Sequence, residues 1–158
     1  MQDWKFVLNY SAMAYVLLLE DLDSDAHEVE SALKQIGSYE LRRFTAASRA
    51  IESLSDALGS GSELPHLIVV DLNLPGSSGY ELLRFYHATP KLQSIPCAVW
   101  SVMDSETDKK LTTWMGSKKL ISKQSGPATL RKALTSLLKT EATRGSTSTL
   151  DQRPPKRA

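Results

Sequence analysis

The chain has 158 residues, of which 41% are hydrophobic and 23% are charged, and its formal net charge is +1. This length suits one domain with a single substantial core, and it excludes a receptor module joined to an enzyme module. The nearly neutral charge gives no reason to expect nucleic acid or an anionic membrane as the main partner.

Composition divides the chain into three parts. Residues 1–14 form an N-terminal extension without the basic and apolar regions of a signal peptide, and no stretch is apolar for long enough to span a bilayer. Residues 15–140 carry regularly spaced apolar runs, which predict one folded domain. Residues 141–158 are mainly small, polar and basic, so we expect a disordered C-terminal tail. The single cysteine, Cys97, cannot form an internal disulfide, which favours a reducing cytoplasm.

The first unit of the domain is a strand followed by a helix. Residues 15–19 are apolar or aromatic, as is typical of a buried strand, and they lead directly into Glu20 and Asp21. Asp25 and Glu28 then have the spacing of a capping box at the start of a helix. Apolar residues recur at helical spacing beyond this point, which predicts a helix that ends at a glycine.

The same order of strand and helix repeats four more times. Short apolar runs predict the strands, and apolar residues at helical spacing predict the helices. The expected elements are strand 39–44, helix 47–58, strand 67–70, helix 80–87, strand 95–100, helix 104–115, strand 120–122 and a last helix that begins at Pro127. Five alternating units with buried strands predict a parallel sheet covered by helices on both faces.

The third strand ends in a carboxylate, that of Asp71. An ionised aspartate is costly to bury without a partner, so this position is expected to face a crevice that holds a cation, a donor or solvent. The Pro75-Gly76 pair predicts a turn, and Ser77 or Ser78 can cap the next helix. Taken alone, Asp71 is explained more simply as a helix cap.

Polar side chains follow the other strands as well, which changes the interpretation of Asp71. Glu20 and Asp21 follow the first strand, Ser101 the fourth and Lys123 the fifth. Because the carboxyl ends of parallel strands meet at one edge of a sheet, we expect these side chains to share one crevice. The ordered set outweighs the capping explanation.

This combination of side chains predicts an aspartyl-phosphate site. Clustered carboxylates without His or Cys favour a hard cation such as magnesium. A lysine and a serine hydroxyl can hold phosphoryl oxygens, and an aspartate can attack phosphorus to form an acyl phosphate. The three histidines, His27, His66 and His87, lie on separate elements, so neither a histidine metal cluster nor a phosphorelay histidine is expected.

Over residues 15–139 the sequence resembles the receiver domain of two-component response regulators. The acidic pair, the aspartate, the hydroxyl and the lysine stand in the order and spacing of that family, as do Pro75 and Gly79 after the aspartate. The resemblance implies an α/β fold of the flavodoxin-like (βα)5 type, with five helices around a doubly wound, five-stranded parallel sheet. It also implies the strand order 2-1-3-4-5.

The resemblance further implies a role for each site residue. Asp71 would be the phosphoryl acceptor, and Ser101 and Lys123 would assist it. The magnesium ligands would be Glu20, partly through water, Asp21, Asp71 and the backbone carbonyl of Asn73.

Four positions depart from the family pattern. Leu22 stands where a further acidic or amide residue is frequent, and Gln124 stands where a proline usually follows the lysine. Leu120 replaces an aromatic residue whose rotamer change usually reports phosphorylation. Val102 is bulkier than the small residue common after the hydroxyl, and we expect it to narrow access to the phosphoryl group.

The function implied is that of a single-domain response regulator, with no enzyme activity beyond its own phosphorylation and dephosphorylation. The phosphoryl donor would be a sensor histidine kinase, such as one of phytochrome type, or a histidine phosphotransfer protein. No DNA-binding unit is expected after the last helix. Output would therefore go to a downstream protein target or to a homodimer through the fourth helix, fifth strand and fifth helix.

Two alternatives differ in class. A degenerate receiver that acts as a phosphorylation-independent docking or dimerisation module is left open by Leu120 and Gln124. A flavin-binding module or small phosphatase on the same sheet is disfavoured. The acidic pair would repel a flavin phosphate, and Asn73 stands where a phosphatase of the haloacid-dehalogenase type needs a second aspartate.

Overall fold

The computed structural model describes residues 13–102 and 105–146, which form one five-stranded sheet with helices on both faces. The strands of this sheet are β1 (Tyr15–Leu19), β2 (Glu40–Phe44), β3 (Leu67–Val70), β6 (Cys97–Ser101) and β7 (Lys119–Ser122). Neighbouring strands are parallel, and their spatial order is β2-β1-β3-β6-β7. This order confirms the predicted 2-1-3-4-5 topology.

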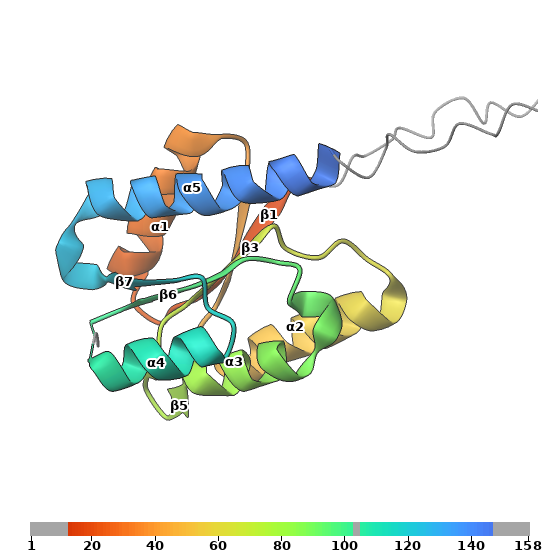
Figure 1. The fold of residues 1–158 in the computed structure, drawn as a ribbon, viewed down its shortest axis with the longest axis horizontal. Helices are drawn as coiled ribbons and strands as arrows, with labels where there is room; N and C mark the ends of the chain where they lie inside the picture. The colour runs from red at the N-terminus through yellow and green to blue at the C-terminus, as the bar shows by residue number, and fades with distance from the viewer. Residues whose placement is uncertain (1–12, 103–104, 147–158) are drawn as a thin grey trace, which may run out of the picture.

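In the part of the chain that the structure describes, five α-helices cover the sheet in two layers. They are α1 (Asp23–Ile36), α2 (Ala47–Ser60), α3 (Gly79–Ala88), α4 (Glu106–Trp114) and α5 (Pro127–Ser146), with short 3-10 turns η2 (Pro90–Leu92) and η3 (Lys123–Ser125). Helices α1 and α5 lie on one face of the sheet, and α2, α3 and α4 lie on the other (Figure 1). The doubly wound architecture is therefore confirmed.

The core consists of two apolar clusters, one on each face of the sheet. Side chains alternate between the faces along a strand. In β1, Leu17 and Leu19 pack toward α2 and α3, whereas Val16 and Leu18 pack toward α1 and α5. Strands β1, β3 and β6 are buried at every position, while β2, at the sheet edge, is partly exposed. This pattern explains why the central strands have continuous apolar sequences.

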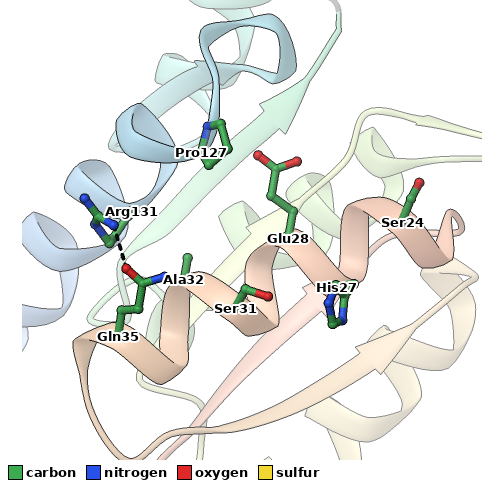
Figure 2. Close-up of a pocket in the computed structure, with 8 residues that line it drawn as sticks. All are labelled: Ser24, His27, Glu28, Ser31, Ala32, Gln35, Pro127 and Arg131. Atoms are coloured by element: carbon green, nitrogen blue, oxygen red, sulfur yellow. Dashed lines mark hydrogen bonds between the residues drawn. The ribbon is translucent and has the colours of Figure 1, made fainter.

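Helices α1 and α5 are neighbours although they come from opposite ends of the domain. A surface pocket of about 360 Å³ lies between them, and the hydrogen bond from Arg131 Nη1 to Gln35 Oε1, 2.5 Å long, bridges the two helices (Figure 2). This bond joins residues 96 positions apart in sequence. The contact ties the last helix of the domain to the first.

The start of α1 differs from the prediction. The helix begins at Asp23, its N-cap is Leu22, and no side chain caps it, so the expected capping box of Asp25 and Glu28 is wrong. The Leu22 carbonyl accepts the backbone N–H of Ala26 at 3.0 Å, which starts the helical hydrogen bonds earlier than expected. Asp25 is therefore within the first turn, and its carboxylate is available for another role.

The segment between β3 and α3 contains a small hairpin that the sequence did not reveal. Strands β4 (Asn73–Leu74) and β5 (Ser77–Ser78) pair in antiparallel fashion around the Pro75-Gly76 turn. The Ser78 hydroxyl accepts the backbone N–H of Tyr80 at 3.2 Å and caps α3, as one of the two predicted serines. The hairpin holds the segment after Asp71 in a fixed shape.

The end of the domain also differs from the prediction. Helix α5 continues to Ser146, beyond the point at which the tail was expected to begin. Glu, Ala and Arg are good helix formers, and they occur in this extra turn. Residues 147–158, most of the predicted tail, and residues 1–12 of the predicted extension lie outside the described residues. Within the described ranges, no helix combines the length and the apolar character needed to cross a membrane.

Candidate functional site

The site lies at the carboxyl edge of the sheet because the strands are in register there. Leu19 of β1 pairs with Val70 of β3, so the residues that follow them, Glu20 and Asp71, leave the sheet side by side. Beyond β3 in the same sheet, Ser101 of β6 pairs with Ser122 of β7, so Lys123, the residue after Ser122, lies at the same edge. The parallel arrangement thus places three charged side chains together.

Lys123 is the centre of this arrangement. Its ammonium donates to carboxylate oxygens of Glu20 at 2.6 Å, Asp25 at 2.7 Å and Asp71 at 2.9 Å. The lysine side chain is only 10% exposed, and its nitrogen lies 4.9 Å from the centre of the Trp100 ring. Burial alone would lower the pKa of this ammonium, but the three carboxylate hydrogen bonds outweigh burial and raise the pKa. Lys123 is therefore held in its charged form.

Asp25 is the site residue that the sequence reasoning missed. Its spacing predicts a capping box, yet its carboxylate is one of the three that bind Lys123. The available signal was its position in the first turn of the helix that directly follows Glu20 and Asp21, which places it at the same end of the sheet.

Three carboxylates form a cluster that fits a hard divalent cation. Glu20, Asp21 and Asp71 each offer an oxygen, and these oxygens lie within 4.8 Å of one another. Glu20 and Asp71 are also fixed by backbone donors, since Leu22 N–H binds Glu20 Oε1 at 3.1 Å and Asn73 N–H binds Asp71 Oδ1 at 3.0 Å. Oxygen ligands of this kind suit Mg²⁺ or Mn²⁺.

The Glu20 carboxylate is fully buried, which affects its ionisation. Burial raises the pKa of Glu20, and the hydrogen bonds from Lys123 and the Leu22 backbone offset part of that rise. A carboxylate in this position depends on its cationic neighbour to stay ionised.

A cavity of about 330 Å³ opens above the carboxylates. Its lining residues are Asp21, Leu22, Asp25, Asp71, Asn73, Leu74, Pro75, Val102 and Lys123. Glu20 and Ser101 are fully buried at the same edge of the sheet, and Val102 is the half-exposed residue from the end of β6 that lines the cavity. The cavity therefore brings together the predicted Asp21, Asp71, Asn73 and Lys123.

The turn after Lys123 uses the residue that replaces the usual proline. The Ser122 hydroxyl accepts the backbone N–H of Gln124 at 3.2 Å and thereby caps η3. A proline at position 124 would have no N–H to donate. Gln124, which departs from the family pattern, therefore allows a hydrogen bond that stabilises the turn and that a proline could not form.

A second polar network joins the start of α3 to the start of α4. The Tyr80 hydroxyl donates to Asp108 Oδ1 at 2.5 Å, and the Ser105 hydroxyl donates to Asp108 Oδ2 at 2.6 Å. Burial, together with the bond to Asp108, raises the pKa of Tyr80 to about 12. The bonds from Ser105 and Tyr80 lower the pKa of Asp108. Helix α4 is thus tied to the helix that follows the Asp71 loop.

We expect Tyr80→Phe to lower the free energy of unfolding by about 1.5–3 kcal/mol near neutral pH, because Asp108 loses a charge-assisted hydrogen bond. The contribution of the hydroxyl is fully present below a pH of about 10, the unfolded pKa of tyrosine, and is lost as pH rises through about 12. The contribution of the hydroxyl also decreases in acid, as Asp108, whose pKa is lowered in the folded protein, becomes protonated. Urea unfolding across a pH series measures the difference between the two proteins.

Tyr39→Phe is the matched control for this measurement. The Tyr39 ring is half-buried and packs against His66, but its hydroxyl forms no hydrogen bond within the described part of the chain. Its removal should change stability little. A Tyr80→Phe effect that stays constant from neutral to strongly alkaline pH would contradict the assignment.

Comparisons with known proteins identify the family of the chain. Residues 16–135 match the family described as the response regulator receiver domain. The protein PilH of Pseudomonas aeruginosa is 23% identical over 127 residues, which cover 80% of this chain and 98% of PilH. The response regulator Rcp1 of Synechocystis is 33% identical over 97 residues, which cover 59% of this chain and 65% of Rcp1.

Solved structures show the same fold. The phosphorylated cyanobacterial phytochrome response regulator RcpA superposes with a TM-score of 0.68 at 26% identity, covering 89% of this chain and all of the RcpA chain. The Mn(2+)-bound form of Rcp1 gives a TM-score of 0.62 at 25% identity, covering 90% of this chain and 99% of the other. With its fold, its strand-end residues and its family match over most of its length, the chain belongs to the response regulator receiver domain family.

Proposed function

We propose that this chain is a response regulator in which Asp71 accepts a phosphoryl group and the modified domain signals through protein contacts. The observation that carries the proposal is the Lys123 ammonium, which donates to Asp71 at 2.9 Å inside a cluster of carboxylates. Asp71 is buried but lines the cavity, so its oxygen is open to a donor from one side only. This is the setting that an acyl phosphate requires.

The proposed reaction is a transfer of the phosphoryl group from the donor to Asp71, and the neighbouring charged residues position and stabilise that group. An oxygen of Asp71 forms a bond to phosphorus while the bond from phosphorus to the donor's imidazole nitrogen breaks, and the electron pair leaves with the nitrogen. Lys123 then moves its hydrogen bond from Asp71 to a phosphoryl oxygen, and the Ser101 hydroxyl is the proposed second donor. Val102, at the cavity wall, limits the size of the group that can approach.

Magnesium is the proposed cofactor of this site. Glu20, through water, Asp21, Asp71 and the backbone carbonyl of Asn73 would hold it, and the bound ion would neutralise the charge that develops on the phosphoryl oxygens. The acidic cluster supports this assignment, as does the Mn(2+)-bound form of the relative Rcp1.

The proposed phosphoryl donor is a sensor histidine kinase or a histidine phosphotransfer protein. The similarity to the phytochrome response regulator RcpA supports a kinase of phytochrome type. The proposed output is a downstream protein or a second copy of the chain, through the surface of α4, β7 and α5, rather than DNA. We also propose a cytoplasmic location, in keeping with the single buried cysteine.

Phosphorylation at Asp71 can be tested with the purified chain, Mg²⁺ and acetyl phosphate. We expect intact mass spectrometry to show the gain of one phosphoryl group in the wild-type chain and none in Asp71→Asn, which keeps the size of the side chain but is not a nucleophile. Asp56→Asn, at an exposed aspartate of α2, should be modified like the wild type.

The outcome also separates the competing function. If the wild-type chain gains no phosphoryl group, or if Asp71→Asn gains it equally, the acceptor assignment fails. A folded wild-type chain that takes no phosphoryl group would favour the phosphorylation-independent docking module instead.

A further inference from the structure

Arg43, on the edge strand β2, makes a set of contacts that the proposed phosphoryl chemistry does not use. Its Nε donates to the backbone carbonyl of Glu20 at 2.9 Å, and its Nη2 donates to the backbone carbonyl of Asp21 at 2.7 Å. Its Nη1 donates to Asp23 Oδ1 at 2.6 Å. One guanidinium thus binds the main chain of both consecutive acidic residues.

These contacts are more than a surface ion pair. The Asp23 side chain is 95% exposed, so its pairing with Arg43 contributes little. The two carbonyls, in contrast, belong to residues that follow the end of β1, where the Glu20 N–H still donates to the backbone carbonyl of Phe44 in β2. The planar guanidinium supplies two parallel donors and so fixes both peptide planes at once.

The orientation of those peptide planes decides where the acidic side chains point. Glu20 and Asp21 supply two of the three carboxylates whose oxygens lie within 4.8 Å of one another. If the main chain between β1 and α1 were free to rotate, the two carboxylates would repel each other and separate. Arg43 binds both carbonyls from outside the cavity, since it is not among the residues that line it.

We propose that Arg43 is a positioning residue for the divalent cation site, acting on the backbone of Glu20 and Asp21. This inference rests on the proposed function only in that the carboxylate cluster binds a cation. Groups that orient metal ligands typically change metal affinity by about 10–100-fold when they are removed. The chain's own neighbouring arginine provides a matched comparison.

Arg42 is the control because it carries the same charge on the same strand but faces differently. Its guanidinium stacks on the Tyr15 ring at 3.8 Å and pairs with Glu40, so it does not bind the acidic loop. Electrostatics alone predicts that removing either positive charge should strengthen the binding of a cation. Positioning predicts the opposite for Arg43, so the sign of the effect separates the two explanations.

The experiment measures Mg²⁺ affinity by calorimetry, without any phosphoryl donor, for the wild type, Arg43→Ala, Arg42→Ala and Asp23→Ala. We expect Arg43→Ala to bind Mg²⁺ at least about tenfold more weakly, and the other two variants to bind within about twofold of the wild type. Asp23→Ala removes the ion pair and leaves both carbonyl contacts in place. Arg43→Lys keeps the charge but lacks the two-pronged geometry, so an intermediate affinity is expected.

The unfolding free energy in EDTA is measured for each variant to separate positioning from general loss of stability. If Arg43→Ala does not fold, Arg43→Lys carries the test. Wild-type affinity in the Arg43 variant, or equal weakening in Arg42→Ala, would overturn the positioning role while leaving the cation site intact. Absence of Mg²⁺ binding by the wild-type chain would overturn both, and phosphorylation of Asp71 would then be judged by its own assay.

Discussion

Lys123→Met is expected to lower the free energy of unfolding by about 3–5 kcal/mol at neutral pH, in the absence of Mg²⁺. The variant keeps the length of the side chain but leaves three carboxylates without their shared cation. Two of them, Glu20 and Asp71, have side chains that are 0% and 5% exposed. Buried charges that lose their partner are among the largest sources of destabilisation by a single substitution.

The pH dependence of this effect has a definite sign. Burial already raises the pKa of Glu20 in the wild-type protein, and removal of Lys123 takes away the larger of the two hydrogen bonds that offset this rise. A carboxyl with a raised folded pKa favours folding below its unfolded pKa, of about 4, and loses that contribution as pH rises. The deficit of Lys123→Met should therefore shrink in mild acid, which urea unfolding at several pH values can measure.

Lys119→Met is the control for the loss of a lysine from the same strand. Lys119 lies on β7 and is exposed, so its replacement should change stability by no more than about 0.5 kcal/mol. Added Mg²⁺ should recover part of the stability of Lys123→Met, because a bound cation replaces the missing charge. Equal effects of the two substitutions would show that Lys123 is not the electrostatic centre of the site.

Gly79→Ala is expected to destabilise the protein by about 3 kcal/mol, at the upper end of the range for overpacking. A Cβ at this position would lie 2.1 Å from the backbone oxygen of Asp71 and 2.8 Å from Val70 Cγ1. One of these contacts is with the main chain, so no side-chain rotation can relieve it. The start of α3 would have to move away from the end of β3, and the Asp71 loop with it.

Gly59→Ala provides the comparison, because it is also a glycine-to-alanine change within a helix. Nothing lies within 4 Å of a Cβ built on Gly59 in α2, so alanine should stabilise the protein there by about 0.5–1 kcal/mol. Opposite signs for the two variants in thermal or urea unfolding would support the close approach at Gly79. A neutral Gly79→Ala would contradict it.

The sequence allowed the fold to be predicted because one physical pattern governs the three central strands, β1, β3 and β6. Each central strand is buried on both faces and therefore reads as a continuous apolar run, as in residues 67–70. The polar residues that follow such runs, for example Asp71 and Lys123, stand out against them. Their convergence then follows from the parallel direction of the strands and requires no knowledge of distances.

Other features could not be predicted because they depend on competition between similar local interactions. Asp25 fits a capping box by spacing, yet in the folded chain it binds a lysine 98 positions away. In the sequence, Arg43 is an ordinary charged residue of an edge strand. The residues next to it in the sequence do not indicate that it contacts the backbone of Glu20 and Asp21. Such roles arise only when the loop after β1 is packed against β2.

The position of Lys123 along the chain has a consequence for synthesis. The lysine lies 103 residues after Glu20 and 52 after Asp71, so both carboxylates leave the ribosome well before their counter-charge. Until β7 docks, β6 is an open edge of the sheet and the acidic cluster lacks its internal cation. Addition of the last strand to the nascent domain and assembly of the charged centre are therefore one event, so that an unfinished chain has no complete centre at Asp71.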